Sequence, residues 1–229
     1  MTTVILFRHG RTSANAGSVL AGDQPIDLDD AGQQQARAAG VRLAGLPLAA
    51  VVSSPLLRCW RSVELALPGA EIEPEPRLAE CGYGTWTGRP LKELAKQPLW
   101  RVVQVHPSAA VFPEGESMAA MSARAIAAVR ERDARVEAQH GSDAVWLACS
   151  HGDVIKAIVA DAMGVHLDLF QRIVIDPGSL TVIRYTPLRP FLLRLNDTGS
   201  LEGLVPKRRR GRSRRRSSDA AVGGGASAS

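Results

Sequence analysis

The chain has 229 residues, of which 45% are apolar and 22% charged, an ordinary composition for one globular domain. The net charge of the chain is +5, and residues 206–229 alone carry +7, which leaves −2 for residues 1–205. The basic character of the chain is therefore no argument that the folded part binds nucleic acid. No apolar run reaches the ~20 residues of a membrane span, and no signal peptide is expected before Arg8, so no membrane contact is expected. The three cysteines form no CxxC pair, which fits a reducing cytoplasm.

The first predicted elements alternate between strand and helix. Residues 3–7 are rich in β-formers and predict a buried strand that ends at an Arg-His-Gly sequence. Asp29-Asp30 supplies the N-cap of a helix that runs to about Leu43. Residues 49–52 predict a second strand, and Pro55 suits the first turn of the helix that follows.

The middle of the chain is less regular. Residues 68–76 are broken by prolines and predict a short strand among loops, and a short helix is expected near residues 91–95. A long helix is predicted from about Ser117 to Gln139, with Gly141 as its stop. Its apolar face contains Met118, Met121, Ala125, Val129 and Val136.

The last third repeats the first pattern. Residues 144–149 predict a strand that ends at Ser-His-Gly, a helix follows from Asp153 to Met163, and two strands are expected near residues 180–185 and 191–195. The alternation predicts an α/β fold, a three-layer sandwich with a mostly parallel central sheet flanked by helices.

The predicted domain spans residues 1–205. Residues 206–229 form a basic and then Gly/Ala/Ser-rich tail that is predicted to be disordered. The tail contains no aromatic residue for base stacking, so any polyanion binding by it would be weak and non-specific.

Polar residues follow three of the predicted strands. The sequences are Arg8-His9-Gly10, Ser53-Ser54-Pro55 with Arg58, and Ser150-His151-Gly152. Because the carboxyl ends of parallel strands form the binding crevice of such sheets, we expect these clusters to converge. Two histidines and two arginines around one point suit a dianionic group such as a phosphate ester.

Five motifs in order resemble those of the histidine phosphatase superfamily, which includes cofactor-dependent phosphoglycerate mutases. Residues 8–15 look like its RHGxTxxN signature, 53–58 match SSPLxR, and 78–88 resemble its LxE…G…G block. Residues 113–117 are close to its PGGES motif, and Ser150-His151-Gly152 match its second histidine motif. The resemblance covers roughly residues 3–196, and the Ala/Arg-rich composition is similar to that of actinobacterial phosphatase members.

The resemblance implies metal-independent hydrolysis of phosphate monoesters with His9 as the covalent nucleophile. Glu80 would protonate the leaving oxygen and then activate water. The implied phosphate pocket contains Arg8, Asn15, Arg58, His151 and Gly152. No cofactor or metal is implied, and the expected partner is a small phosphorylated metabolite.

Several of these residues have plainer alternatives. Arg58 could be an exposed helix residue, Glu80 a solvated loop carboxylate and Asn15 a turn residue. Lys92 and Lys96 would share a helix face that either caps the pocket or is simply solvated.

Three alternative functions stay open at this point. A mutase would need additional cations, but the 24 residues between Gly88 and Pro113 lack the longer insertion with paired arginines that glycolytic mutases of the family have. The intact motif residues His9, Arg58, Glu80 and His151 argue against an inactive phosphate-binding domain with a nucleic-acid-binding tail. A metal site built from His9, Glu80, His151 and Asp153 is disfavoured by the neighbouring arginines. The oligomeric state is left open, a homodimer included.

Overall fold

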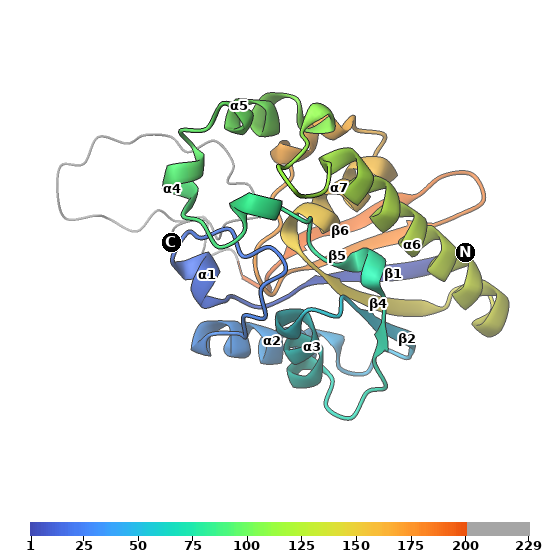
Figure 1. Ribbon diagram of the computed structural model, residues 1–229. Coiled ribbons are helices and arrows are strands. Elements are labelled where there is room, and N and C mark those ends of the chain that lie inside the picture. Colours follow the sequence, from blue (N-terminus) through green and yellow to red (C-terminus); the bar gives the residue numbers. More distant parts are fainter. Residues whose placement is uncertain (201–229) are drawn as a thin grey trace.

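The computed structural model describes residues 1–200, which fold around one six-stranded sheet (Figure 1). The tail predicted at residues 206–229, like the domain boundary at 205, lies outside the described residues. None of the helices within residues 1–200 has the length and apolar content that crossing a bilayer requires.

The central sheet has the strand order β3-β2-β4-β1-β5-β6. Neighbouring strands from β3 to β1 are parallel, whereas β5 and β6 are antiparallel to their neighbours. The predicted mostly parallel sheet is thus confirmed. The strands are β1 (Thr2–Arg8), β2 (Leu48–Ser53), β3 (Glu73–Pro74), β4 (Val145–Ser150), β5 (Leu180–Tyr185) and β6 (Phe191–Asp197).

Helices cover both faces of the sheet and complete the predicted three layers. Helices α2 (Asp30–Leu43) and α3 (Leu57–Ala66) lie on one face, and α6 (Met118–His140) and α7 (Gly152–Ala162) lie on the other (Figure 1). An apolar cluster fills each interface: Phe7, Leu43 and Val63 belong to one, and Leu6, Met121 and Ile155 to the other. Strand β1 is buried along its whole length, as its unbroken apolar run predicts.

The remaining helices are short. They are α1 (Ser13–Ala16), α4 (Leu91–Leu94), α5 (Pro98–Val105) and 3₁₀ turns at Pro76–Leu78, Gly84–Trp86, Pro107–Ala109 and Leu167–Arg172.

Local sequence signals explain where the long helices begin and end. The Asp29 carboxylate accepts a hydrogen bond from the backbone N–H of Gly32 at 2.8 Å, so it caps α2 as predicted. Helix α6 buries all five residues of its predicted apolar face and ends before Gly141, whose φ of 82° lies in the region that favours glycine.

Two local predictions are wrong, and one helix is missing from the prediction. Pro55 precedes α3 instead of occupying its first turn, because the Ser54 hydroxyl accepts from the N–H of Leu56 and the chain stays extended there. Helix α5 was not predicted, although Pro98 at its start is a helix signal. Lys96 lies beyond the end of α4, so it does not share a helix face with Lys92, and both side chains are exposed.

Candidate active site

The three polar clusters meet at one edge of the sheet, as the sequence predicts. Arg8 at the end of β1 pairs in register with Ser150 of β4, and Ser53 at the end of β2 pairs with Cys149. The hydrogen bond from the backbone N–H of His9 to the carbonyl of Ser150 (3.1 Å) extends this pairing into the loop. Parallel pairing therefore joins segments that lie far apart in the chain.

His9 is held with one ring nitrogen engaged and the other available. Its side chain is 97% buried, and Nδ1 lies 2.7 Å from the carbonyl oxygen of Gly10. Since a carbonyl can only accept, Nδ1 carries the proton and Nε2 keeps a lone pair. Burial, followed by the charges of Arg58 and Arg8, holds the pKa of His9 well below its ordinary value. The ring is therefore neutral near neutral pH, with a lone pair on Nε2.

A small cavity joins His9 to three other predicted site residues, Asn15, Arg58 and Glu80. The rest of its lining consists of Thr12, Val19, Leu20, Ala21, Gly22 and Tyr83. Sequence analysis assigned none of these six to the site. Thr12 lies within the first motif, but the segment 19–22 and Tyr83 reach the cavity only through tertiary packing.

Arg8 is fully buried beside this cavity. Its Nη1 donates to the carbonyl of Ile175 at 2.5 Å, while Nε and Nη2 are buried without a hydrogen-bond partner among residues 1–200. Burial lowers the pKa of Arg8, and the nearby carboxylates Glu80 and Asp153 oppose that shift. These two nitrogens carry three N–H groups. Buried N–H groups without partners on a cation are costly, and an anion is the ligand that would satisfy them.

Arg58 is positioned by the first turn of α3. It is buried, not an exposed helix residue, and its guanidinium donates to the carbonyls of Gly22 (2.6 Å) and Gln24 (3.2 Å). Ser62 connects α3 to the loop that follows β1. Its hydroxyl accepts a hydrogen bond from the N–H of Gly10 (3.0 Å) and donates one to the carbonyl of Arg58.

His151 occupies the N-cap of α7, with Gly152 as the first helical residue. Its ring centroid lies 5.2 Å from that of His9, and its Nε2 shares a hydrogen bond with the Ser54 hydroxyl at 2.8 Å. Burial and then Arg58 and His9 lower the pKa of His151. Gly152 is buried, and neither it nor His151 is among the residues that line the cavity.

Glu80 lies in a loop and points into the cavity. It is only 8% exposed, so the solvated-carboxylate alternative is wrong. Burial and the neighbouring Asp153 raise the pKa of Glu80 to about 7, against the opposing charges of Arg58 and Arg8. A carboxyl group with this pKa can give and take a proton near neutral pH.

Asn15 has a local structural role in addition to its place in the cavity. Its Oδ1 accepts from the backbone N–H and the hydroxyl of Thr12, both at 3.0 Å, in a capping box at α1. Only its amide N–H groups are left to donate to a ligand. Arg11 pairs with Asp29 at 2.8 Å and does not line the cavity.

A buried polar layer supports the site from beneath. Tyr83 donates to Asp153 at 3.1 Å, and Lys156 lies 3.4 Å from the other oxygen of the same carboxylate. Sequence analysis missed this layer because it joins a loop to α7, although the spacing of Asp153 and Lys156 on one helix is a detectable signal. Within residues 1–200, no three His, Cys, Asp or Glu side chains are grouped as a metal site would need.

Comparison with known proteins agrees with this geometry. A model of the histidine phosphatase superfamily (branch 1) matches residues 4–198. The chain is 31% identical over 177 residues to a protein named probable phosphoglycerate mutase from Erwinia tasmaniensis, covering 76% of this chain and 80% of that one.

Two further relatives extend the comparison. A glucosyl-3-phosphoglycerate phosphatase from Mycolicibacterium vanbaalenii is 31% identical over 171 residues, 72% of this chain and 76% of its own. The solved structure of Bacillus stearothermophilus YhfR superposes with a TM-score of 0.78 at 26% identity, covering 86% of this chain and 98% of that chain. The chain therefore belongs to the histidine phosphatase superfamily and is an enzyme of the phosphatase class.

Proposed function

We propose that this enzyme hydrolyses phosphate monoesters without a metal ion, through a phosphohistidine intermediate on His9. The observation that carries the proposal is the position of His9 in one cavity with Arg58 and Glu80, with its Nδ1 proton engaged by Gly10. The unpartnered N–H groups of the adjacent Arg8 support it, because they suit the oxygens of a phosphoryl group.

In the first step, the lone pair on His9 Nε2 attacks phosphorus, and the bond from phosphorus to the ester oxygen breaks. Glu80 in its acid form donates a proton to that leaving oxygen, so an alcohol departs. The cationic groups of Arg8 and Arg58 offset charge on the transferred phosphoryl oxygens. The step needs His9 neutral and Glu80 protonated, and the directions of the two pKa shifts favour this combination.

In the second step, the Glu80 carboxylate takes a proton from water, and the resulting hydroxide attacks phosphorus. The bond between phosphorus and Nε2 breaks, and inorganic phosphate forms. His9 recovers its lone pair and Glu80 its proton, so both groups are ready for another cycle. Dividing the displacement in two lets one carboxyl group serve as acid and then as base.

We favour hydrolysis over phosphoglycerate mutase activity. A mutase holds a bisphosphorylated intermediate, which calls for cations on both sides of the transferred group. In the described part of the chain, Arg58 is the one basic side chain among the cavity-lining residues other than His9, and Val19, Leu20, Ala21 and Tyr83 supply uncharged lining. Lys92 and Lys96 are exposed and do not line it.

This lining favours a small phosphorylated metabolite whose alcohol portion carries little additional negative charge. The mycobacterial relative named a phosphatase supports hydrolysis, whereas the Erwinia relative named a probable mutase supports the second candidate. The two candidates share the chemistry at His9 and differ in the acceptor of the phosphoryl group.

The test is a panel of phosphomonoesters assayed in parallel with a phosphoglycerate mutase assay on the same preparation, with and without EDTA. We expect inorganic phosphate release without isomerisation of phosphoglycerate, unchanged by the chelator. Isomerisation faster than phosphate release would establish the mutase instead. Activity lost in EDTA and restored by one metal would overturn metal independence.

A further inference from the structure

We infer that Arg124, on α6, is a positioning residue that fixes Glu80 in the cavity. The inference rests on the proposed function, in which Glu80 is the general acid. Arg124 lies 44 positions along the chain from Glu80 and does not line the cavity, so it would act on the reaction only through Glu80.

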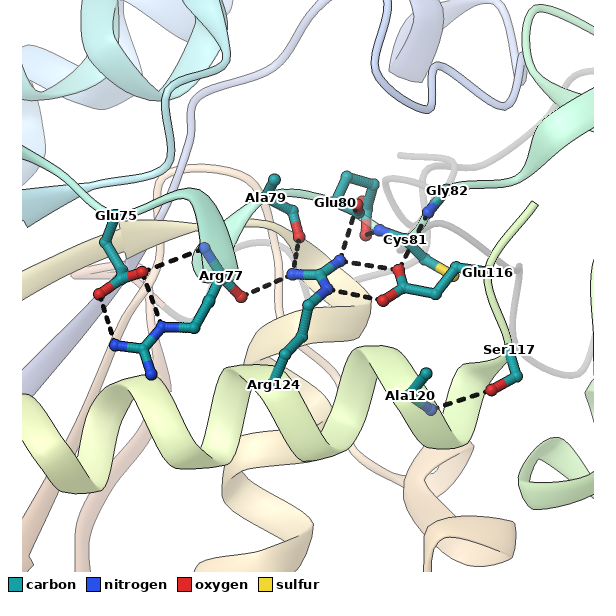
Figure 2. A network of polar contacts seen from close by, with 10 residues as sticks. All are labelled: Glu75, Arg77, Ala79, Glu80, Cys81, Gly82, Glu116, Ser117, Ala120 and Arg124. Atoms are coloured by element: carbon teal, nitrogen blue, oxygen red, sulfur yellow. Dashed lines mark hydrogen bonds and ion pairs between the residues drawn. The ribbon is translucent and has the colours of Figure 1, made fainter.

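Every N–H of the Arg124 guanidinium has a partner, either in residues 77–80 or in the Glu116 carboxylate (Figure 2). Nη1 donates to the carbonyls of Arg77 (2.5 Å) and Ala79 (2.8 Å), and Nη2 donates to the carbonyl of Glu80 (3.0 Å). The remaining N–H groups form a two-point pair with the Glu116 carboxylate, at 2.7 and 2.9 Å. All five donors of the guanidinium are therefore used.

Glu80 depends on such backbone support. It belongs to no helix or strand, and its carboxylate accepts a hydrogen bond from the next backbone N–H, that of Cys81, at 3.1 Å. That bond moves with the loop and cannot anchor it. The direction of the Glu80 side chain consequently depends on where the carbonyls of residues 77–80 are held.

Glu116 extends the support to the other side of Glu80. Its backbone N–H donates to the carbonyl of Gly82 at 2.6 Å, and its carboxylate accepts from the N–H of Gly82 at 3.3 Å (Figure 2). Arg124 holds the loop before Glu80 and Glu116 holds it after, with the ion pair joining the two. The loop is thus fastened at both flanks of the acid.

The geometry of the guanidinium matters more than its charge. The Glu116 carboxylate pairs with that charge at 2.7 Å, and the largest influences on the pKa of Glu80 are burial, Asp153 and Arg58. A lysine offers three donors from a single nitrogen and cannot span three carbonyls and a carboxylate. We therefore expect Arg124→Lys to be defective although it preserves the charge.

The experiment measures kcat/KM for an alkyl phosphate and for p-nitrophenyl phosphate in Arg124→Gln, Glu80→Gln and the double variant. An aryl oxide leaves with little protonation, so a displaced acid should matter mainly for the alkyl ester. For Arg124→Gln we expect a loss of about 10–100-fold on the alkyl ester and less than about threefold on the aryl ester. The double variant should match Glu80→Gln within about threefold, because both changes remove the same function.

The outcomes separate this inference from the function it rests on. Equal losses on both esters in Glu80→Gln would remove Glu80 as the acid, and the inference with it. A leaving-group dependence in Glu80→Gln but equal losses in Arg124→Gln would overturn the inference alone. Additive losses in the double variant would show that Arg124 acts independently of Glu80.

The matched control is Arg130→Gln, because Arg130 lies on the same helix and its exposed side chain pairs with Asp161 at 2.6 Å, away from the cavity. It should leave both kcat/KM values unchanged. If Arg124→Gln does not fold, as judged by circular dichroism, Arg124→Lys and Glu116→Gln carry the same comparison. A folded Arg124→Lys with wild-type activity on the alkyl ester would also overturn the inference.

Discussion

Two hollows lie at opposite ends of β1, and they differ in size and in chemistry. The larger, about 370 Å³, lies at the start of β1 among Met1, the middle of α6 and residues 185–190. The smaller, about 20 Å³, lies past the end of β1 and is lined by His9, Arg58 and Glu80. By volume alone, the larger hollow would be the default candidate for a binding site.

Most ionisable groups of the larger hollow already have partners, and its Arg189 is exposed to solvent instead of buried. Arg130 pairs with Asp161, the N-terminal ammonium pairs with Glu137, and the buried Asp133 accepts from the indole N–H of Trp146 at 3.0 Å. Next to the smaller hollow, Arg8 keeps the N–H groups of Nε and Nη2 buried and without partners among residues 1–200. The difference teaches that unsatisfied buried charge locates this active site better than volume does.

The largest effect is expected when the His9 imidazole is removed from the smaller hollow. His9→Ala should reduce kcat/KM for any phosphate ester by at least about 10⁴-fold, because no other group can accept the phosphoryl group. Phosphate release measures it. His166→Ala is the control, since His166 is exposed and pairs with Asp168 at 3.3 Å. Residual turnover above one part in about 10³ would point to a different nucleophile.

The next largest effect concerns the unpartnered donors. Arg8→Lys keeps the charge but loses the planar N–H fork, so we expect kcat/KM to fall by about 10²–10³-fold and vanadate inhibition to weaken in parallel. The matched control is Arg61→Lys, whose exposed side chain pairs with Glu64 at 2.6 Å. A loss of less than about threefold would mean that the buried N–H groups of Arg8 do not meet the phosphoryl group.

A smaller effect is expected from pH. Glu80, with a pKa raised to about 7, acts as an acid only while protonated, so kcat/KM for an alkyl ester should fall about tenfold per unit above that pH. Because the pKa of His9 is lowered, its neutral form persists into acid and does not set this limb. The pH profile of Glu80→Gln should lack the alkaline decline. An unchanged decline in that variant would assign it to another group.

The smallest effect is expected at the larger hollow. Arg130→Gln combined with Glu137→Gln should change kcat/KM by less than about twofold and lower stability by no more than about 1 kcal/mol, as for exposed ion pairs. Thermal unfolding and phosphate release measure the two quantities. A large loss of activity at unchanged stability would break the contrast, because it would tie the larger hollow to the reaction.

Sequence analysis predicted the framework of the site because its signals are local. Apolar runs located β1, β2 and β4, and the polar residues directly after each strand had to meet once those strands paired in parallel. The burial of Arg58 and Glu80 could not be predicted with the same certainty, since an arginine on a helix and a glutamate in a loop are usually solvated.

The supporting contacts were beyond sequence reasoning because they join distant segments. The Arg124 guanidinium meets carbonyls 44 to 47 positions earlier in the chain, and no local pattern marks that pairing. The wrong prediction for Pro55 also has a tertiary cause. The Ser54 hydroxyl, which accepts from the N–H of Leu56, is itself hydrogen-bonded to His151. Tertiary contacts decide these details where local propensity allows several outcomes.

The central claim is that His9 carries the phosphoryl group, and trapping the intermediate tests it most directly. The enzyme and its Glu80→Gln variant are mixed with excess p-nitrophenyl phosphate, denatured in alkali, in which phosphohistidine survives, and examined by intact mass and peptide mapping. We predict one phosphoryl group per chain on the peptide containing His9, more of it in Glu80→Gln, and none in His9→Ala. A phosphoryl group on another residue, or continued turnover with no phosphoenzyme in either form, would contradict the account.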